Sequence, residues 1–428
     1  MYIKTLQDEN IGPIENLKID FSFNEEGKPK PIIFVGENGC GKSLLLSNIV
    51  DSFYCIAQKG FDNAMEKADT GGEEYYKNIS PSQIKVGKEY LYSFISYKDF
   101  PVHYVFKAGK LSVEKFKELS NCATSVRYTW KENNSFKGTN ATEEQSTKIF
   151  SENVVCYFGP DRYEKPNWLG NKYYSTLEKE HITLNTKISR YLSNPISVKG
   201  VTELNLKWLL DVIVDSRSDI EQRGENLNIA HINVKDLLLL GSARKNIETI
   251  MSKILGQDVY FNLKIRSTNA NRFEIRTQKD NSLLVPSLDF LSTGQLALFN
   301  IFSTIIRYAD KQDINKSIKL NDIQGIVVVD EIELHLHPSL QKDVLPELLH
   351  LFPKVQFIIT THSPLFLLGM EDTYGTENYE IYQLPLANKI DAEDFSEFQK
   401  AYTFLTNTER YKKEIREIIN QYSDKKAL

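Results

Sequence analysis

The sequence lacks the features that define several large classes of protein. It has only four cysteines in 428 residues (Cys40, Cys55, Cys122 and Cys156) and no C-x-x-C pair, which indicates reduced thiols rather than a disulfide framework. No apolar run is long enough to cross a bilayer, and the first residues are polar and charged where a secretory signal needs an apolar core. We therefore expect a cytoplasmic protein that does not enter a membrane.

A strong charge imbalance is also missing. The 52 Lys and Arg residues nearly balance the 57 Asp and Glu residues, and the net charge is −5. This predicts no general attraction to nucleic acid or to anionic lipid, although a local basic groove is compatible with it. We find no internal repeat and no low-complexity segment. The hydrophobic share of 41% is that of an ordinary globular protein with a sizeable core.

A phosphate-binding motif follows the first buried strand pattern, Pro31–Val35. The eight residues Gly36-Glu37-Asn38-Gly39-Cys40-Gly41-Lys42-Ser43 have the pattern G-x-x-x-x-G-K-S, and Leu44 begins an apolar helical pattern. Glycines in such a loop let backbone N–H groups surround the phosphates, while the lysine neutralises the outer phosphates and the serine hydroxyl binds Mg²⁺. A glycine-rich turn with an incidental lysine would not explain the strand before it and the helix after it. We predict that these residues and Leu44 contact a nucleoside triphosphate.

A pair of acids ends a second apolar strand pattern. Ile326–Val329 is followed directly by Asp330 and Glu331. In P-loop enzymes the first acid helps to hold Mg²⁺, and a glutamate directly after it can polarise the attacking water. Acids at the end of a strand can also be a plain surface turn. Because the same chain has a P-loop, we predict that Ser43 and Asp330 bind the metal and that Glu331 is the catalytic base.

Between these two motifs lies Leu291-Ser292-Thr293-Gly294-Gln295, followed by an apolar helical pattern. A serine hydroxyl, a glycine amide and a helix N-terminus suit an anion, although an ordinary capped helix would use the same residues. LSTGQ, GENGCGKS and VVVDE together resemble the ABC-type ATPases, in particular their RecF, SMC and OLD-like branch. The resemblance implies that the nucleotide is ATP. It also implies that Ser292, Gly294 and Gln295 reach the γ-phosphate held by a second copy of the chain.

Three histidines near these motifs are further candidates. His362 follows the strand pattern Val355–Thr360 and resembles the switch histidine of this branch, which implies a catalytic contact with the γ-phosphate and the attacking water. A structural histidine at a strand end is the alternative. His335 and His337 form an H-x-H pair, which could bind a metal. The pattern DE-x-E-x-H-L-H-P also resembles the D-loop of RecF and OLD-like proteins, which implies a place at a dimer interface.

Two parts of the expected family pattern are missing. No glutamine occupies the position of the Q-loop, and the segment Cys156–Tyr163 lies roughly there, so Asp161 or Arg162 is a candidate for that role. We also find no residue that would stack on adenine. The preference for ATP over GTP is therefore implied by the resemblance alone.

We predict an α/β fold, namely an ABC-type P-loop head with an antiparallel β subdomain and an inserted helical region. The expected units are a split ATPase core (1–60 and 285–385), a β-rich elaboration (61–160), a helical or lid insertion (161–284) and a C-terminal helical tail (386–428). Within the insertion, Thr176–Leu255 is expected to be mostly helical, and Val259–Ile265 with Arg272–Thr277 to form a hairpin. The tail predicts two amphipathic helices, either packed on their own domain or forming a docking surface.

The length of the chain restricts the kind of ATPase. A transporter does not fit because no membrane span is found, and an SMC protein would need long heptad helices. An OLD-like nuclease would need a Toprim domain, for which the residues after Ser363-Pro364 are too few. The chain instead resembles the stand-alone ATPases of bacterial antiphage systems of the Septu and retron-associated PtuA type. This implies a homodimer or higher homo-oligomer that acts with a separately encoded HNH-type nuclease. The alternative is a RecF-like DNA-repair ATPase that binds DNA without a nuclease.

Overall fold

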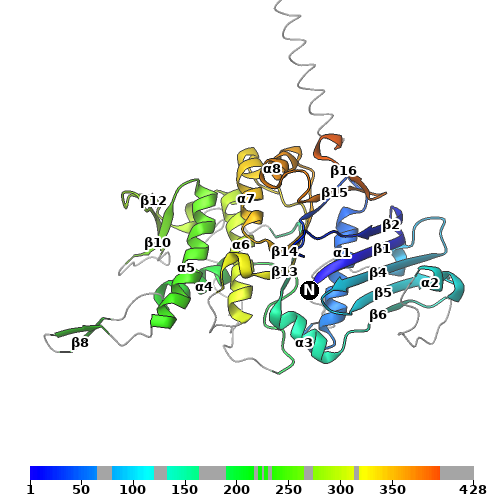
Figure 1. Cartoon of the computed structure of the whole chain (residues 1–428), viewed down its shortest axis with the longest axis horizontal. Helices are drawn as coiled ribbons and strands as arrows, with labels where there is room; N and C mark the ends of the chain where they lie inside the picture. Colours follow the sequence, from blue (N-terminus) through cyan, green and yellow to red (C-terminus); the bar gives the residue numbers. More distant parts are fainter. Residues whose placement is uncertain are drawn as a thin grey trace, which may run out of the picture.

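The structure, a computed structural model, describes residues 1–64, 80–119, 133–162, 189–215, 220–223, 226–229, 234–264, 273–312 and 318–395. At its centre is a six-stranded sheet in the order β16-β15-β3-β14-β13-β7 (Figure 1). The strands are β3 (Ile32–Val35), β7 (Val154–Phe158), β13 (Gln324–Val329), β14 (Lys354–Thr360), β15 (Glu380–Gln383) and β16 (Asn388–Ile390). All neighbouring strands are parallel except β16, which pairs antiparallel with β15.

The central strands are apolar on both sides because both faces of the sheet are covered. Ile33 and Val35 of β3 point into one hydrophobic cluster, and Ile32 and Phe34 point into another. The alternation of side chains along a strand thus divides the core into two halves that meet at the sheet.

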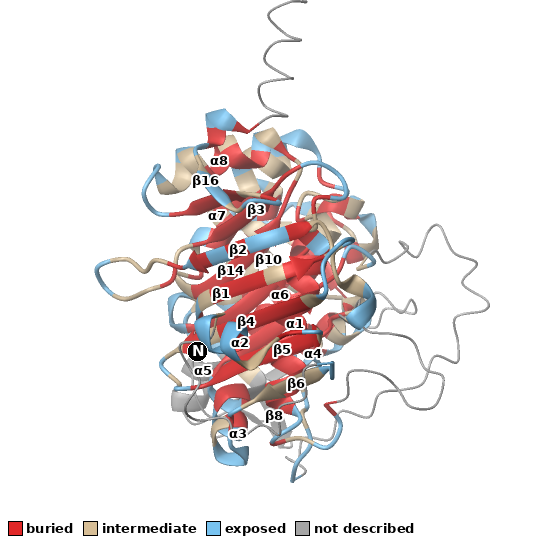
Figure 2. Cartoon of the chain, turned by 90° about the vertical axis from the view of Figure 1, so that its right-hand side faces the viewer, coloured by how far each residue is buried: buried red, intermediate tan, exposed pale blue. Residues whose placement is uncertain are grey.

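A second sheet and one helix cover one face of the central sheet. The antiparallel sheet has the order β2-β1-β4-β5-β6 and joins strands from two stretches of the chain. Its strands are β1 (Tyr2–Ile11), β2 (Ile14–Asp20), β4 (Tyr90–Lys98), β5 (His103–Gly109) and β6 (Phe136–Thr139). Helix α1 (Lys42–Ala57) is buried along nearly its whole length between the two sheets. The short helices α2 (Val113–Leu119) and α3 (Glu143–Glu152) lie at the edge of this layer, and Figure 2 shows how much of the layer is buried.

Helices cover the other face. They are α4 (Thr202–Asp215), α5 (Val234–Leu255), α6 (Thr293–Gln312), α7 (Leu345–His350) and α8 (Pro364–Tyr374), with a π-helical turn at Leu340–Val344 before α7. Apolar residues of α6 such as Leu298, Phe302 and Ile305 are fully buried in the cluster that contains Val327 and Val329 of β13. Helices α1 and α6 therefore pack on opposite faces of the same sheet.

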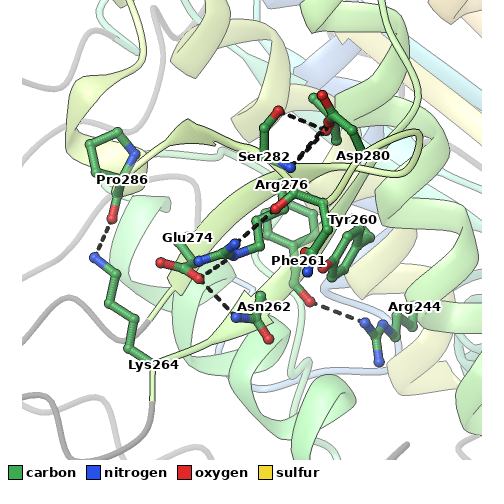
Figure 3. Close-up of polar contacts among 12 residues, drawn as sticks. Arg244, Tyr260, Phe261, Asn262, Lys264, Glu274, Arg276, Asp280, Ser282 and Pro286 are labelled. Carbon is green, nitrogen blue, oxygen red and sulfur yellow. Dashed lines mark hydrogen bonds and ion pairs between the residues drawn. The ribbon is translucent and has the colours of Figure 1, made fainter.

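A three-stranded sheet precedes α6 in the chain. It consists of β10 (Val259–Leu263), β11 (Phe273–Thr277) and β12 (Leu283–Val285). Figure 3 shows its polar contacts: Asn262 and Arg276 both donate to Glu274, and Lys264 donates to the carbonyl of Pro286. These contacts fix the segment that leads into the start of α6.

The structure confirms the predicted α/β class and differs from the sequence analysis in detail. In the described part of Thr176–Leu255, the expected helices are present as α4 and α5, and the pair of strands β8 (Ile220–Arg223) and β9 (Asn226–Ile229) was not expected. The expected hairpin is present and gains β12 as a third strand. The division into domains stays a prediction. Strands β7 and β16, which it gave to the elaboration and the tail, belong to the central sheet.

Two further expectations concern the tail and the membrane. The two amphipathic helices expected in the tail fall at 396–428, outside the described residues. Among the helices that the structure describes, none combines the length and the apolar character needed to cross a bilayer.

Candidate nucleotide-binding and hydrolysis site

Four parallel strands bring the predicted motifs to one edge of the central sheet. The P-loop follows β3, Asp330 follows β13, His362 follows β14, and a turn that contains Arg162 follows β7. The carboxyl ends of parallel strands lie at the same edge, which is where open α/β sheets bind their ligands. The strand register therefore assembles a site from segments that are far apart in the sequence.

The P-loop is shaped by its glycines. Gly36 has φ 146° and Gly41, the residue before α1, has φ 104°, conformations that residues with a Cβ rarely adopt. A Cβ on Gly36 would also lie 2.8 Å from the carbonyl oxygen of Leu384. Glu37, Asn38 and Gly39 are exposed, so the loop presents its backbone to solvent in front of the N-terminus of α1.

Lys42 and Ser43 begin α1 and have different surroundings. The residue Lys42 is 7% exposed. Its ammonium donates to the carbonyls of Gly36 at 2.8 Å and Glu37 at 3.2 Å. The lysine charge is thus held inside the loop, where it can neutralise phosphate oxygens. Ser43 is exposed, whereas Cys40 and Leu44 are buried beneath the loop.

Asp330 is fully buried at the end of β13. The hydroxyl of Thr360 donates to its Oδ1, and its Oδ2 has no hydrogen-bond partner among the described residues. A buried carboxylate oxygen without a partner is costly unless a ligand meets it, and carboxylate oxygens suit Mg²⁺. The donor set therefore fits a magnesium ion held by Asp330 and Ser43 together with phosphate oxygens. Clusters of three or more His, Cys, Asp or Glu side chains suited to a metal are absent from the described residues, and His337 Nδ1 instead lies 2.9 Å from the hydroxyl of Ser339.

Glu331 has a left-handed backbone conformation, with φ 47°. Its N–H donates to the hydroxyl of Thr360 at 2.8 Å. Arg162 donates to the carbonyls of Asp330 at 2.5 Å and of Glu331 at 2.6 Å. Burial lowers the pKa of Arg162, while the nearby carboxylates of Asp330, Glu333 and Glu331 act in the opposite direction. Of the two Q-loop candidates, Arg162 thus contacts the acids, whereas Asp161 forms an ion pair with Lys199.

His362 is anchored through its backbone. Its N–H donates to Oε1 of Glu333 at 2.6 Å, and Oε2 of Glu333 is buried without a hydrogen-bond partner in the described part of the chain. The backbone of His362 is thus held to Glu333, which lies on the loop that follows Asp330 and Glu331. His335, with φ 65°, lies on the loop that follows them.

The signature segment forms the capped N-terminus of α6. The N–H of Ser292 donates to Oε1 of Gln295, and the N–H of Gln295 donates to Oγ of Ser292, at 3.0 and 3.3 Å. This reciprocal pair is a capping box. Ser292 is exposed, and Gly294 is buried against the backbone of His335 and Leu336. The segment therefore contacts the loop after Glu331, and the two hydrogen bonds of its capping box are made within the segment itself.

Sequence reasoning missed Thr360 and Glu333. Thr360 holds both Asp330 and the N–H of Glu331, and Glu333 holds His362. Each of these two side chains contacts a residue that is far away in the sequence, so spacing along the chain does not reveal the contact. The pattern DE-x-E contains Glu333, and this repeated acid is the signal that could have singled it out.

A glycine-rich loop before a helix, a buried acid with a free oxygen and an adjacent glutamate define a P-loop ATPase site. Residues 186–368 match the family model described as "AAA domain, putative AbiEii toxin, Type IV TA system". This span contains the signature segment, Asp330, Glu331 and His362, and the pairing of β3 with β14 adds the P-loop. Residues 186–368 are thus similar to an AAA-type ATPase domain, and this match together with the site indicates the enzyme class of the ATP hydrolases.

The chain is similar to two bacterial proteins along most of its length. The Retron Ec83 probable ATPase of Escherichia coli is 24% identical over 398 residues, which cover 83% of this chain and 67% of that protein. Septu protein PtuA of Bacillus mycoides (strain KBAB4) is 25% identical over 458 residues, which cover 99% of this chain and 50% of that protein. The chain thus spans about two thirds of one relative and half of the other.

Among solved structures, the chain is similar to an SMC head. In the crystal structure of the SmcHead bound to the C-winged helix domain of ScpA, the match covers 92% of this chain and 99% of that chain. The sequences are 13% identical and the TM-score is 0.43.

Proposed function

We propose that two copies of this chain bind ATP head to tail, and that the ATP-dependent dimer controls a separately encoded HNH-type nuclease in antiphage defence. In each composite site one copy provides the P-loop, Asp330, Glu331 and His362. The other copy provides Ser292, Gly294 and Gln295. The cofactors are ATP and Mg²⁺.

The observation that supports the proposed dimer is the separation of α1 from α6. These helices pack on opposite faces of the central sheet, and the signature at the start of α6 leaves Ser292 exposed. The N-terminus of a helix is a ready anion site, and here it belongs to a helix on the opposite face of the sheet from the helix that follows the P-loop. A two-fold arrangement gives each signature a phosphate on the other copy.

Within one composite site, each residue has a distinct role. Lys42 and the amides of the P-loop bind and orient the phosphates, and Ser43 with Asp330 would hold Mg²⁺, which supplies charge neutralisation when bound. Glu331 takes the proton from the attacking water, and His362 orients that water next to the γ-phosphate. Within one chain, the loop that carries His335 lies against Gly294, and so it connects Glu331 of one composite site with the signature segment that serves the other.

The antiphage role is supported by the relatives, whose names are a retron ATPase and a Septu protein, and by the motif pattern. The RecF-like alternative predicts direct binding of duplex DNA instead. A protein that neutralises phosphates of DNA loses affinity steeply as salt rises. Salt-dependent DNA binding therefore separates the two functions.

The test is a phage challenge of cells that carry this chain with the nuclease gene encoded beside it. We expect protection with the parent pair, and loss of protection when either the nuclease is omitted or Lys42 is changed to Ala. Protection that survives Lys42→Ala would contradict control by ATP. Protection by this chain alone, together with salt-dependent duplex binding by the purified protein, would favour the RecF-like function.

A further inference from the structure

We propose that Arg162 is a positioning residue for ATP hydrolysis, whose guanidinium holds the backbone turn at Asp330–Glu331 and thereby aims the Glu331 carboxylate. The inference rests on the role proposed for Glu331 as the base. Arg162 lies outside the P-loop, the signature segment and the Asp330–Glu331 pair, so the inference adds a new residue to the site.

The position of Arg162 follows from the sheet. Strands β7 and β13 are parallel, with Phe158 opposite Val329, and the N–H of Asp330 donates to the carbonyl of Phe158 at 2.9 Å. The turn after β7 returns Arg162 to the end of β13. Its Nη1 donates to the carbonyls of Gly159 at 3.0 Å and Asp330 at 2.5 Å, and its Nη2 donates to the carbonyl of Glu331 at 2.6 Å.

The peptide between Asp330 and Glu331 is held at both ends. Arg162 binds its carbonyl oxygen, and the hydroxyl of Thr360 accepts its N–H. The same hydroxyl donates to the Asp330 carboxylate. Rotation of this peptide would break contacts to both β7 and β14, so the direction of the Glu331 side chain is set by two neighbouring strands.

The contacts of Arg162 and Thr360 with this peptide, which we call the clamp, hold Glu331 in a left-handed backbone conformation. Glu331 has φ 47°, and a residue with a side chain pays of order 1 kcal/mol or more to stay in the left-handed region. Such a conformation persists only where the surroundings over-determine it. The carbonyl of Glu331 also accepts from Arg162, so the guanidinium contacts the backbone on both sides of the residue with the left-handed conformation.

Only a guanidinium can make this set of contacts. Its planar fork offers several N–H groups in fixed directions, whereas a lysine ammonium is a single point at the end of a flexible chain. Arg162 is also mostly enclosed among Asp330, Glu331 and Glu333, where its charge offsets theirs. A lysine would keep the charge and lose the clamp.

The test compares Arg162→Ala and Arg162→Lys with the parent for ATP affinity by calorimetry and for kcat. We expect ATP affinity within about 3-fold of the parent, since Lys42 and the P-loop are untouched, and a kcat lowered about 10- to 100-fold by the misdirected base. Arg162→Lys should recover only a small part of the loss. Free guanidinium at low concentration should raise kcat of Arg162→Ala and leave Glu331→Gln inactive.

Lys199→Ala is the matched control. Lys199 pairs with Asp161, the neighbour of Arg162, and both Lys199 and Arg162 line a small cavity at the start of α6. The control variant should retain the parent kcat. If kcat of Arg162→Ala stays within about 3-fold of the parent, or falls only together with ATP affinity and melting temperature and without guanidinium rescue, the inference is overturned. If Arg162→Ala does not fold, Arg162→Lys with parental kcat overturns it. Turnover that survives Glu331→Gln would instead refute the proposed role of Glu331.

Discussion

At the scale of single residues, the proposed hydrolysis depends on the carboxylate of Glu331, which is partly exposed. Replacing Glu331 by Gln keeps the size of the side chain and removes the proposed base. We expect ATP to bind with nearly parental affinity and to remain unhydrolysed, with kcat lowered about 10²- to 10⁴-fold. Single-turnover measurement of ATP cleavage checks this. A turnover close to that of the parent would move the catalytic role to another residue, with His362 the first candidate.

Glu333 offers a pair of variants that separates hydrogen bonding from charge. Its Oε1 accepts the backbone N–H of His362 at 2.6 Å. Glu333→Gln keeps an acceptor in the same place, whereas Glu333→Ala removes it and leaves the partly buried N–H of His362 without this partner. We expect kcat to fall about 10-fold in the alanine variant and to stay near the parent in the glutamine variant. Equal losses in both variants would show that the charge of Glu333 matters rather than its contact with His362.

The residues proposed to carry out the chemistry can be recognised in the sequence, because loop, strand and acid follow one another at fixed spacing. The strand order then brings Gly36 to Ser43 and Asp330–Glu331 to one edge of the central sheet. The contacts that orient these residues could not be predicted in the same way, although Arg162 is one of two candidates for the Q-loop. Thr360 and Arg162 act on Asp330 and Glu331 from β14 and the end of β7, and this proximity exists only once the sheet has its order.

At the scale of elements, the signature helix depends on close contact with the loop after Glu331. A Cβ on Gly294 would lie 2.8 Å from the carbonyl oxygen of His335 and 3.3 Å from Cα of Leu336. Gly294→Ala must therefore displace either α6 or this loop, and we expect kcat to fall about 10-fold while ATP binding is retained. Calorimetry and a steady-state assay measure the two effects.

Gly241→Ala in helix α5 is the control for that variant. A Cβ at Gly241 meets no atom within 4 Å, so the substitution should leave turnover unchanged. It should also stabilise the protein by about 0.5–1 kcal/mol, because alanine is the better helix former. If both glycine variants lose activity alike, the loss reflects helix substitution in general and not the contact with His335.

The contact between α1 and the antiparallel sheet contains a buried acid, Asp8, on β1. Burial raises the pKa of Asp8 to about 7, although hydrogen bonds from Ser93 and Asn48 act against this shift. Its Oδ1 accepts from the amide of Asn48 on α1 at 2.8 Å, and its Oδ2 has no hydrogen-bond partner within the described structure. The native protein therefore keeps a proton on Asp8 at a pH where the unfolded chain, with a pKa near 3.8, has lost it.

The sign of the pH effect follows from this difference. Between about pH 4 and pH 7 the native state binds more protons than the unfolded state, so the free energy of unfolding falls as pH rises through this window. Asp8→Asn should remove that fall and should gain on the order of 2–4 kcal/mol relative to the parent between pH 4 and pH 8. Denaturant titrations across this range, with the exposed Asp20→Asn as control, measure it. Parallel pH profiles for the parent and Asp8→Asn would refute the assignment.

At the same scale, the sequence predicted elements with a strong period and missed short ones. The apolar runs of β3, β13 and β14 were recognisable because strands covered on both faces are continuously apolar. Strands β8 and β9 are four residues each, which is too short for a period of two to separate them from the helical patterns on either side. Strand β16 is three residues long and owes its place to pairing with β15.

At the scale of the whole molecule, the proposed split site predicts complementation. Ser292→Arg should abolish hydrolysis and leave ATP binding nearly normal, because a long charged side chain blocks the second copy without touching Lys42, Ser43 or Asp330. Mixing Ser292→Arg with Lys42→Ala, each inactive alone, should restore part of the activity. In a head-to-tail heterodimer one composite site carries both lesions and the other carries neither.

The outcome of that mixture is measured as ATP turnover against the fraction of heterodimer, determined with two different affinity tags. No recovery despite demonstrated heterodimers would mean that the site is not shared or that one site cannot act alone. Normal hydrolysis by Ser292→Arg on its own would refute the role of the signature segment.

The order of the central sheet also determines when the protein can first bind a nucleotide during its synthesis. Strand β3, which leads into the P-loop, pairs with β14 and β15, and the partner of Ile32 is Glu380, over 300 residues later. At ribosomal rates those residues take on the order of 15–60 s to emerge. During that time Ile32–Val35 is an apolar strand with both edges open, a state prone to mispairing with other chains. We therefore expect ATP to bind only after β14 and β15 have been synthesised and have paired with β3.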